Sequence, residues 1–283
     1  MIKKKQNFVS IHGGHSGEFC HHAVDLLEDI INEYIKKKFI WVGITEHIPH
    51  ISDDYLEPDQ LDANINAALL LEKFAAYMKK IRVLQKKYSK EITIYAGIET
   101  EAYTGYKKFV PDIIKKYKPD YMVGSLHHVN DVGFDYSIEY YQKAVIKSGG
   151  YDKMYCDYFD QQYDMIKTLL PAVVGHFDLI RIFDPDYRKR FKKPVIWKKV
   201  CRNLELVKEL NLILDFNLRA LHKGATEPYL TLPILNEAFK MGISVVPGDD
   251  SHGKKEIGQY MDKGIKILEK VGFCTTNFRT PIL

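Results

Sequence analysis

The sequence predicts an α/β fold in one domain, residues 1–283, built on a parallel sheet of seven strands that is either open or closed into a barrel. Short β-type runs alternate with longer helical patterns, as expected for parallel strands joined by right-handed helical crossovers. No internal repeat, low-complexity segment or Pro/Ser-rich linker divides the chain. Polar residues follow the strands, and in parallel α/β architectures such residues meet on one face.

Seven runs rich in β-branched and aromatic residues are expected to form the strands. They cover residues 8–12, 40–45, 92–98, 121–126, 172–175, 212–216 and 244–247. Apolar residues at helical spacing predict the helices that accompany them; in the first helix, Leu27, Ile31 and Tyr34 fall at such spacing. The predicted helices cover residues 20–38, 61–88, 106–117, 137–148, 153–169, 195–210, 230–241 and 255–270.

The connection after the fourth strand is longer than a crossover needs. Residues 136–163 within it hold seven tyrosines. Packing of two amphipathic helices, separated by Gly149 and Gly150, is the preferred interpretation. A lid over a site is the alternative.

The composition is that of an ordinary globular protein, with 46% hydrophobic residues and four cysteines that form no CxxC pair. This argues against a disulfide scaffold and against a zinc ribbon. The N-terminal segment MIKKKQNFVSIHGG is basic but lacks the apolar run of a signal peptide. No stretch approaches the roughly 18 apolar residues of a membrane span. We therefore expect a cytoplasmic protein without a membrane partner.

The net charge of +4 is modest, and most paired lysines fall on the polar faces of predicted helices. This pattern indicates solvated surface and no nucleic-acid partner. The densest basic cluster is RKRFKK, residues 188–193. It is either an exposed loop or a positive rim that attracts an anionic substrate.

The residues that terminate the strands carry the chemical information. In chain order they are His12 and His15, Glu46 and His47, Glu99, His127 and His128, His176, Asn217, and Asp250 and His252. A single histidine at a strand end is ordinarily a hydrogen-bonded structural residue. Seven of the chain's eleven histidines lie at or just after these ends, however, and a structural explanation would have to hold separately for each.

This ligand mixture predicts a cluster of divalent cations. Imidazole and carboxylate together suit Zn, Mn or Fe. The donors exceed what one tetrahedral ion needs, and a carboxylate can bridge two cations. Paired cations stabilise the attacking and leaving oxygens of phosphoryl transfer. The sequence therefore favours a metal-dependent phosphoesterase.

Six motifs in order resemble those of the polymerase and histidinol phosphatase (PHP) superfamily, in particular its histidinol-phosphate phosphatase branch. They are HGGHSGEFCHH at residues 12–22, GITEH at 43–47, GIE at 97–99, GSLHH at 124–128, GHFDLIR at 175–181 and PGDDSH at 247–252. The resemblance implies a distorted seven-stranded (β/α)7 barrel with its active site at the C-terminal ends of the strands. It also implies three divalent ions (Zn, Fe or Mn) and hydrolysis of L-histidinol phosphate to L-histidinol and phosphate in histidine biosynthesis.

The same resemblance implies a ligand set. The first ion would take His12, His15, Glu99 and Asp250, the second Glu99, His127 and His176, and the third His22, His47 and His252. Glu99, Asp250 and His252 would carry the catalytic role.

The first motif departs from the family pattern. The family usually has His-x-His where this chain has His12-Gly-Gly-His15, which leaves the register of His12 open. The family's Cys-x-His favours His22 as the next ligand, whereas counting from His15 would select His21.

Three acidic residues compete with the assigned carboxylates. Glu18 and Glu101 lie beside proposed ligands, and we interpret both as supporting or surface residues. Asp249 precedes Asp250, and the Asp-x-His spacing to His252 decides for Asp250.

The expected partner is a small-molecule phosphomonoester, with Arg181 and Arg219 as the candidate phosphate-binding cations. Glu18, Asp131 and the tyrosines near Tyr136 are candidates for the cationic amino-imidazole end. One alternative is a PHP-type phosphoesterase that acts on nucleotides or nucleic-acid ends. Another is a catalytically silent metal-binding domain. The sequence leaves the oligomeric state open.

Overall fold

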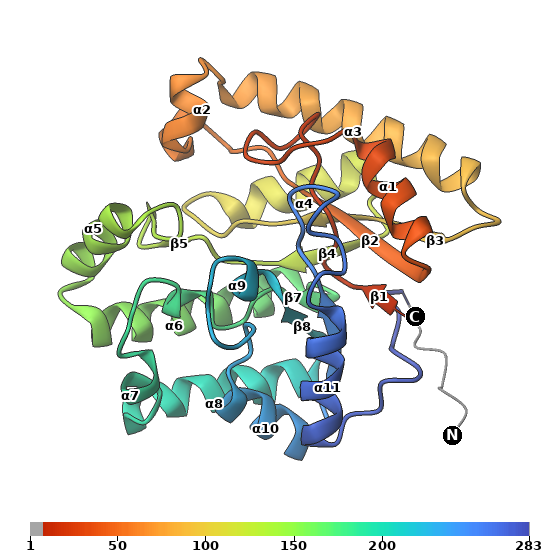
Figure 1. Ribbon diagram of the computed structural model, residues 1–283. Helices are drawn as coiled ribbons and strands as arrows, with labels where there is room; N and C mark the ends of the chain where they lie inside the picture. The colour runs from red at the N-terminus through yellow and green to blue at the C-terminus, as the bar shows by residue number, and fades with distance from the viewer. Residues whose placement is uncertain (1–7, 283) are drawn as a thin grey trace.

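The computed structural model describes residues 8–282. Seven of its strands form one sheet (Figure 1). The strands, in their order across the sheet, are β1 (Phe8–Ser10), β2 (Phe39–His47), β3 (Thr93–Glu99), β4 (Tyr121–Gly124), β7 (Val173–Val174), β8 (Ile213–Asn217) and β9 (Ser244–Gly248). All neighbouring pairs are parallel. Beyond β1, the backbone N–H of Ile11 donates to Pro247 O at 2.9 Å, so the sheet nearly closes on itself. The predicted distorted seven-stranded barrel is confirmed.

Helices surround this barrel (Figure 1). They are α1 (Leu27–Lys36), α2 (Pro58–Asp62), α3 (Ala67–Lys87), α4 (Tyr106–Tyr117), α5 (Ile138–Ser148), α6 (Tyr151–Leu169), α7 (Tyr187–Phe191), α8 (Pro194–Glu209), α9 (Arg219–His222), α10 (Leu232–Lys240) and α11 (Met261–Val271). Two 3₁₀ turns, Asp53–Tyr55 and Leu179–Arg181, and an antiparallel hairpin of β5 (His128–Val129) and β6 (Val132–Gly133) complete the described chain. Residues 1–7 and 283 of the predicted domain, including the start of the basic N-terminal segment, lie outside it.

The predicted helix over residues 20–38 is wrong in its first part. Residues 20–26 form turns and loop, and α1 begins only at Leu27. The Glu18 carboxylate accepts a hydrogen bond from Leu27 N at 2.7 Å and satisfies one of the free amides of the helix start. Asp25 adopts a left-handed conformation (φ 72°), which no helix can continue through. The segment that carries His22 is therefore a fixed loop.

Two other predicted helices are shorter than expected. The prediction over residues 61–88 divides into α2 and α3, because Asn66 caps α3 by accepting from Leu69 N at 2.8 Å. The prediction over residues 255–270 begins late, at Met261, after turns that include Gly258 at φ +66°. The short helices α7 and α9 and the hairpin β5–β6 were absent from the prediction.

The tyrosine-rich segment is mainly a packing element. Tyr141, Tyr155 and Tyr158, on α5 and α6, are fully buried. Tyr136, before α5, is exposed and lines the cavity described below. Helix packing therefore accounts for most of these aromatic residues.

The register of β2 against β3 positions the site. The two strands pair from Trp41 opposite Thr93 to His47 opposite Glu99, so His47 and Glu99 end side by side. Glu99 in turn pairs with Val123 of β4. Because every strand points the same way, the residues that follow the other strands reach the same end of the barrel.

The side chain of Tyr121 crosses the barrel interior. From β4 its hydroxyl group crosses to β1 and donates a 2.5 Å hydrogen bond to Ile11 O. Its ring lies against Gly43 and Gly97, where a Cβ atom would come within 1.7 Å and 2.7 Å of Tyr121 atoms. The close approach of the ring requires glycine at both positions.

No helix within residues 8–282 is long and apolar enough to cross a membrane.

Replacing Gly43 with Ala should lower the free energy of unfolding by about 1–3 kcal/mol or more, since the new methyl group overlaps the Tyr121 ring in the packed interior. Gly133→Ala is the matched control, because its Cβ would meet nothing closer than 3.5 Å. Urea denaturation followed by circular dichroism measures both. Equal stability of Gly43→Ala and the unmodified protein would contradict the account of the barrel interior.

Candidate metal centre

The Glu99 carboxylate is the centre of the site. It is buried at the end of β3, and its oxygens lie within 4 Å of nitrogens from five histidines. The contacts are His12 at 3.4 Å, His15 at 3.8 Å and His47 at 3.1 Å to Oε2, and His127 at 3.4 Å and His176 at 2.8 Å to Oε1. The structure therefore brings histidines from the ends of four strands to a carboxylate at the end of a fifth.

This buried carboxylate is held as an anion. Burial by itself raises the pKa of Glu99, but the surrounding imidazoles of His12, His47 and His127 outweigh it and hold the pKa well below its usual value. An anion in a low-dielectric interior attracts positive charge strongly. Glu99 is therefore a natural partner for cations at both of its oxygens.

A second layer of carboxylates fixes the orientation of the histidines. His12 Nδ1 lies 2.9 Å from Asp215 Oδ2, which leaves Nε2 facing Glu99. His127 Nδ1 lies 2.8 Å from Glu101 Oε2, which likewise leaves Nε2 free to face Glu99. Such outer partners set the tautomer and ring direction of metal-binding histidines. Glu101 is thus a supporting residue, as interpreted from the sequence.

Asp215 was missed by the sequence analysis. It is fully buried in β8, and besides His12 it accepts hydrogen bonds from the Asn217 side chain at 2.9 Å and from His176 N at 3.3 Å. The available signal was a carboxylate inside the otherwise apolar run LILDF, since a buried acid must have polar partners.

His127 and His176 point at a common position. Their Nε2 atoms are 3.3 Å apart, and both face Glu99 Oε1. Two nitrogens that bind one zinc ion at about 2.0–2.1 Å each are separated by roughly 3.3 Å in tetrahedral geometry. The pair therefore has the spacing of two ligands of one ion.

His15 lies between two carboxylates. Its Nε2 is 3.3 Å from Asp250 Oδ1, and its Nδ1 is 3.7 Å from Glu46 Oε2. Burial lowers the pKa of His15, but Asp250 and Glu46 together raise it to about 10. Glu46 is itself anchored by the backbone N–H and hydroxyl group of Ser16. It is a further supporting carboxylate that the sequence analysis did not assign.

The structure separates Asp250 from Asp249. Asp250 N donates to His12 O, and its side chain turns to His15 and Asn217. Its backbone is left-handed (φ 43°), an uncommon conformation for aspartate that is concentrated at functional sites. Asp249 instead accepts hydrogen bonds from Ser10 and Tyr34, away from the histidines. The choice of Asp250 thus has a different physical basis from the extended segment assumed from the sequence.

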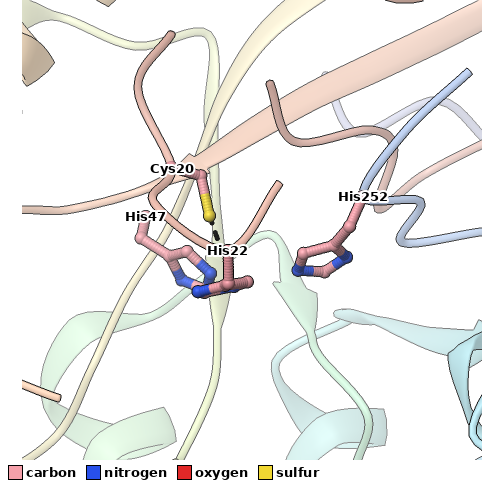
Figure 2. A group of neighbouring side chains, drawn as sticks. All are labelled: Cys20, His22, His47 and His252. Atoms are coloured by element: carbon pink, nitrogen blue, oxygen red, sulfur yellow. Dashed lines mark hydrogen bonds between the residues drawn. The ribbon is translucent and has the colours of Figure 1, made fainter. Parts of the chain in front are cut away.

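A further set of possible metal ligands, the third group of the site after those of His12 and His15 and of His127 and His176, lies beside Glu99 (Figure 2). Its members are Cys20, His22, His47 and His252, whose ligand atoms all lie within 4.8 Å of one another. Cys20 Sγ is 3.3 Å from His22 Nε2, and His252 Nδ1 is 3.1 Å from Asp250 O. His21 also lines the cavity but is not among these four residues. The buried thiol of Cys20 was not counted as a donor from the sequence.

Two members of this group, His47 and His252, have a lowered pKa, whereas Cys20 and Glu57 raise the pKa of His22 against the effect of burial. Burial lowers the pKa of His47 well below its usual value, opposed only in part by Glu99. Burial, with His15 and Arg219, does the same for His252. A neutral imidazole has the free lone pair that a metal ion requires.

The donor set fits divalent cations. Several buried side-chain atoms at the site have no hydrogen-bond partner among residues 8–282: His12 Nε2, both ring nitrogens of His15, His47 Nε2 and Glu46 Oε2. Buried polar atoms in folded proteins almost always have a partner, so a cluster of exceptions indicates an additional bound species. Imidazole and carboxylate are the donors that zinc and transition-metal ions accept, so these side chains could hold such ions.

The two candidate phosphate-binding arginines occupy different positions. Arg219, at the start of α9, lines a cavity of about 290 Å³ above the histidines. Its Nη1 pairs with Glu256, while its buried Nε has no partner among the described residues. Arg181 lies behind the cavity wall: its guanidinium donates to Glu227 O and Pro228 O and packs on the Tyr229 ring, which lines the cavity.

Other predicted rim residues are engaged elsewhere. Glu18 pairs with Lys80, and Asp131 accepts hydrogen bonds from Thr104. In the basic cluster at residues 188–193, Arg188, Arg190 and Lys193 pair with acidic side chains, and no residue of the cluster lines the cavity. The cluster therefore does not form the positive rim considered from the sequence.

Residues 13–219 match the family described as the PHP domain. A protein of Schizosaccharomyces pombe named "Probable histidinol-phosphatase" is 35% identical over 271 residues, covering 94% of this chain and 88% of that protein. The histidinol-phosphatase of Saccharomyces cerevisiae is 27% identical, with 92% of this chain and 88% of that protein covered.

Solved structures share the fold. A crystal structure from Listeria monocytogenes, described as a candidate histidinol phosphatase, superposes with a TM-score of 0.80 at 27% identity and covers 90% of this chain and 99% of its own. Histidinol phosphate phosphatase from Lactococcus lactis, crystallised with zinc, L-histidinol and phosphate, superposes with a TM-score of 0.73 at 18% identity and covers 94% of each chain.

Exchanging His22 for Ala should remove about one bound metal ion per chain, because the third group would lose one of its imidazoles. His21→Ala, the adjacent control, should leave metal content unchanged. Elemental analysis after gel filtration without chelator measures both. If His21→Ala lost the ion and His22→Ala kept it, the register of the loop at residues 12–22 would be wrong.

Proposed function

This chain belongs to the PHP domain family, as its motifs predict, and we propose that it is a metal-dependent phosphomonoesterase that hydrolyses L-histidinol phosphate to L-histidinol and phosphate in histidine biosynthesis. One observation carries the proposal: an anionic, buried Glu99 faces five imidazoles at the base of a cavity. The two named relatives, similar over more than nine-tenths of this chain, support the choice of substrate.

We assign three divalent ions, Zn, Fe or Mn, to the three groups of side chains. The first would be held by His12, His15, Glu99 and Asp250, the second by Glu99, His127 and His176, and the third by His22, His47 and His252. When bound, such ions lower the pKa of water towards neutrality and offset the charge of the phosphoryl group. Cys20, the remaining member of the third group, adds a soft donor that favours zinc there.

Glu99, Asp250 and His252 have separate roles at this site. One carboxylate oxygen of Glu99 faces His12 of the first group and the other faces His176 of the second group, so Glu99 would contribute to both. Asp250 stays an anion, because burial is outweighed by His12 and His15, which hold its pKa well below its usual value. It lines the cavity and can orient an attacking water by accepting its hydrogen bond. His252 also lines the cavity and is a member of the third group.

Arg219 is the phosphate-binding cation that the geometry favours. Arg219 lines the cavity, its buried Nε has no hydrogen-bond partner among residues 8–282, and a guanidinium group suits the oxygens of a phosphate. Arg181 supports the site from behind through its contact with Tyr229. A substrate made of nucleic acid would instead require a continuous basic groove, and the basic cluster at residues 188–193 is paired with acids.

Protein reloaded with Zn or Mn should hydrolyse L-histidinol phosphate with a kcat/KM at least about 100-fold above that for a nucleoside monophosphate or a short single-stranded DNA. The reason is that cavity size and charge select a small phosphomonoester with a cationic end. Phosphate release measures the three rates, and chelator-treated protein is the control. A nucleotide or DNA rate equal to or above that of histidinol phosphate would contradict the proposed substrate.

Glu99→Gln should lower kcat by more than about 100-fold and reduce metal content, because the amide removes the charge that two groups share. Glu101→Gln is the matched control, because Glu101 is also buried but contacts His127, His128 and the backbone N–H of Ala102 and not the other histidines of the site. Its effect should stay within roughly 10–100-fold. Near-normal turnover of Glu99→Gln with full metal content would show that the carboxylate is not shared between ions.

A further inference from the structure

The charged residues of the cavity are unevenly distributed. Arg219 and Lys223 line it from the region of α9. Glu57, before α2, and Asp135, between β6 and α5, line it from elements that lie apart from α9 in Figure 1. The cavity therefore has a cationic part and an anionic part, in addition to the metal-binding groups at its base. Such a division suits a ligand that carries charges of both signs.

Most carboxylates around this cavity already have protein partners. Glu57 faces His22, Glu101 pairs with His127 and His128, and Glu46 accepts from Ser16. Asp135 differs, because its half-buried carboxylate makes no hydrogen bond or ion pair with any residue among 8–282. A partly desolvated carboxylate without a partner is costly, and a cationic ligand would satisfy it.

The backbone beside Asp135 is held in place. The preceding residue, Phe134, is fully buried, and its N–H donates to His127 O at 3.0 Å. The Phe134 ring packs edge-on against Tyr141 and Tyr158. Asp135 is thereby fixed next to a histidine of the metal centre, so its carboxylate is positioned before any ligand arrives.

Asp135 lies close to the metal centre. Asp135 and His127 line the same cavity, and the hydrogen bond from Phe134 N to His127 O joins the segment before Asp135 to that histidine. The carboxylate therefore lies beside the part of the cavity wall where the second group would hold its ion.

The chemistry of the proposed substrate matches this position. In L-histidinol phosphate the ammonium group sits on the carbon next to the CH₂–O–P linkage, so the amine must lie near the bound phosphate. A carboxylate that recognises it must therefore stand beside the metal centre and cannot stand at the outer rim. Asp135 satisfies this requirement, whereas Glu18 and Asp131 are held by Lys80 and Thr104.

We propose that Asp135 is the specificity-determining residue that binds the ammonium group of the substrate, while Arg219 and the metal centre take the phosphate. This inference rests on the proposed function. It explains how a site that could act on many phosphomonoesters selects one whose leaving alcohol carries an amine.

The test pairs a change in the protein with a change in the substrate. The probes are L-histidinol phosphate and its des-amino analogue, 3-(imidazol-4-yl)propyl phosphate, with metal-loaded protein. Asp135→Asn should raise the KM for histidinol phosphate by about 10- to 100-fold, with kcat changed only a few-fold, because a charge-assisted hydrogen bond is lost. The same variant should leave the KM for the analogue unchanged.

Asp131→Asn is the matched control, four residues away in the same connection, and should alter neither substrate's KM. In the unmodified protein the analogue alone should show a KM about 10- to 100-fold higher than histidinol phosphate, a measurement that does not depend on the folding of any variant. Equal KM values for the two substrates in the unmodified protein, or equal losses for both in Asp135→Asn, would overturn the assignment. Hydrolysis of the analogue but not of histidinol phosphate by the unmodified protein would instead overturn the proposed function.

Discussion

A single buried carboxylate, that of Glu99, is the constraint on which the rest of the structure depends. Burying an isolated anion in a protein interior costs on the order of several kcal/mol unless opposite charge and hydrogen bonds compensate it. Five histidines around Glu99 supply that compensation in part. The register of β2 with β3, which sets His47 beside Glu99, and the near closure of the barrel at Ile11 and Pro247 serve to bring these side chains together.

The histidines in turn depend on a layer of carboxylates behind them. Asp215 and Glu101 each occupy one nitrogen of a histidine and leave the other facing Glu99, and Glu46 borders His15. These acids come from β8, from the segment just after β3 and from β2, so the barrel strands determine where they lie. Carboxylates thus lie on both sides of His12, His15 and His127, which gives these buried titratable groups polar partners.

Much of this could be predicted from the sequence, because the strands repeat one pattern: an apolar run that ends in a histidine or an acid. That pattern fixes both the fold class and the face on which Glu99, His127 and Asp250 gather. Residues whose role depends on loop geometry were less predictable. The loop before α1 reads as helical because Leu27, Ile31 and Tyr34 keep their spacing, while the break at Asp25 requires a left-handed conformation that periodicity does not reveal.

Hydrogen-bond partners that lie far apart in the chain could not be predicted from the sequence either. Arg181 reads as an arginine just past a strand end, but Glu227 and Pro228, far along the chain, determine that it points behind the cavity. Asp135 and Asp131 look alike in the sequence, and only the structure shows that Asp131 accepts hydrogen bonds from Thr104 while Asp135 has no such partner among residues 8–282. Asp215 was overlooked for the opposite reason, since a residue inside a strand was read as core.

Anomalous diffraction from crystals grown with zinc or manganese and without chelator tests the central claim most directly. The account predicts anomalous peaks in contact with both carboxylate oxygens of Glu99, together with a peak at the group formed by His22, His47 and His252. A single ion on one oxygen of Glu99, or ions that contact none of the Glu99 oxygens, would contradict it.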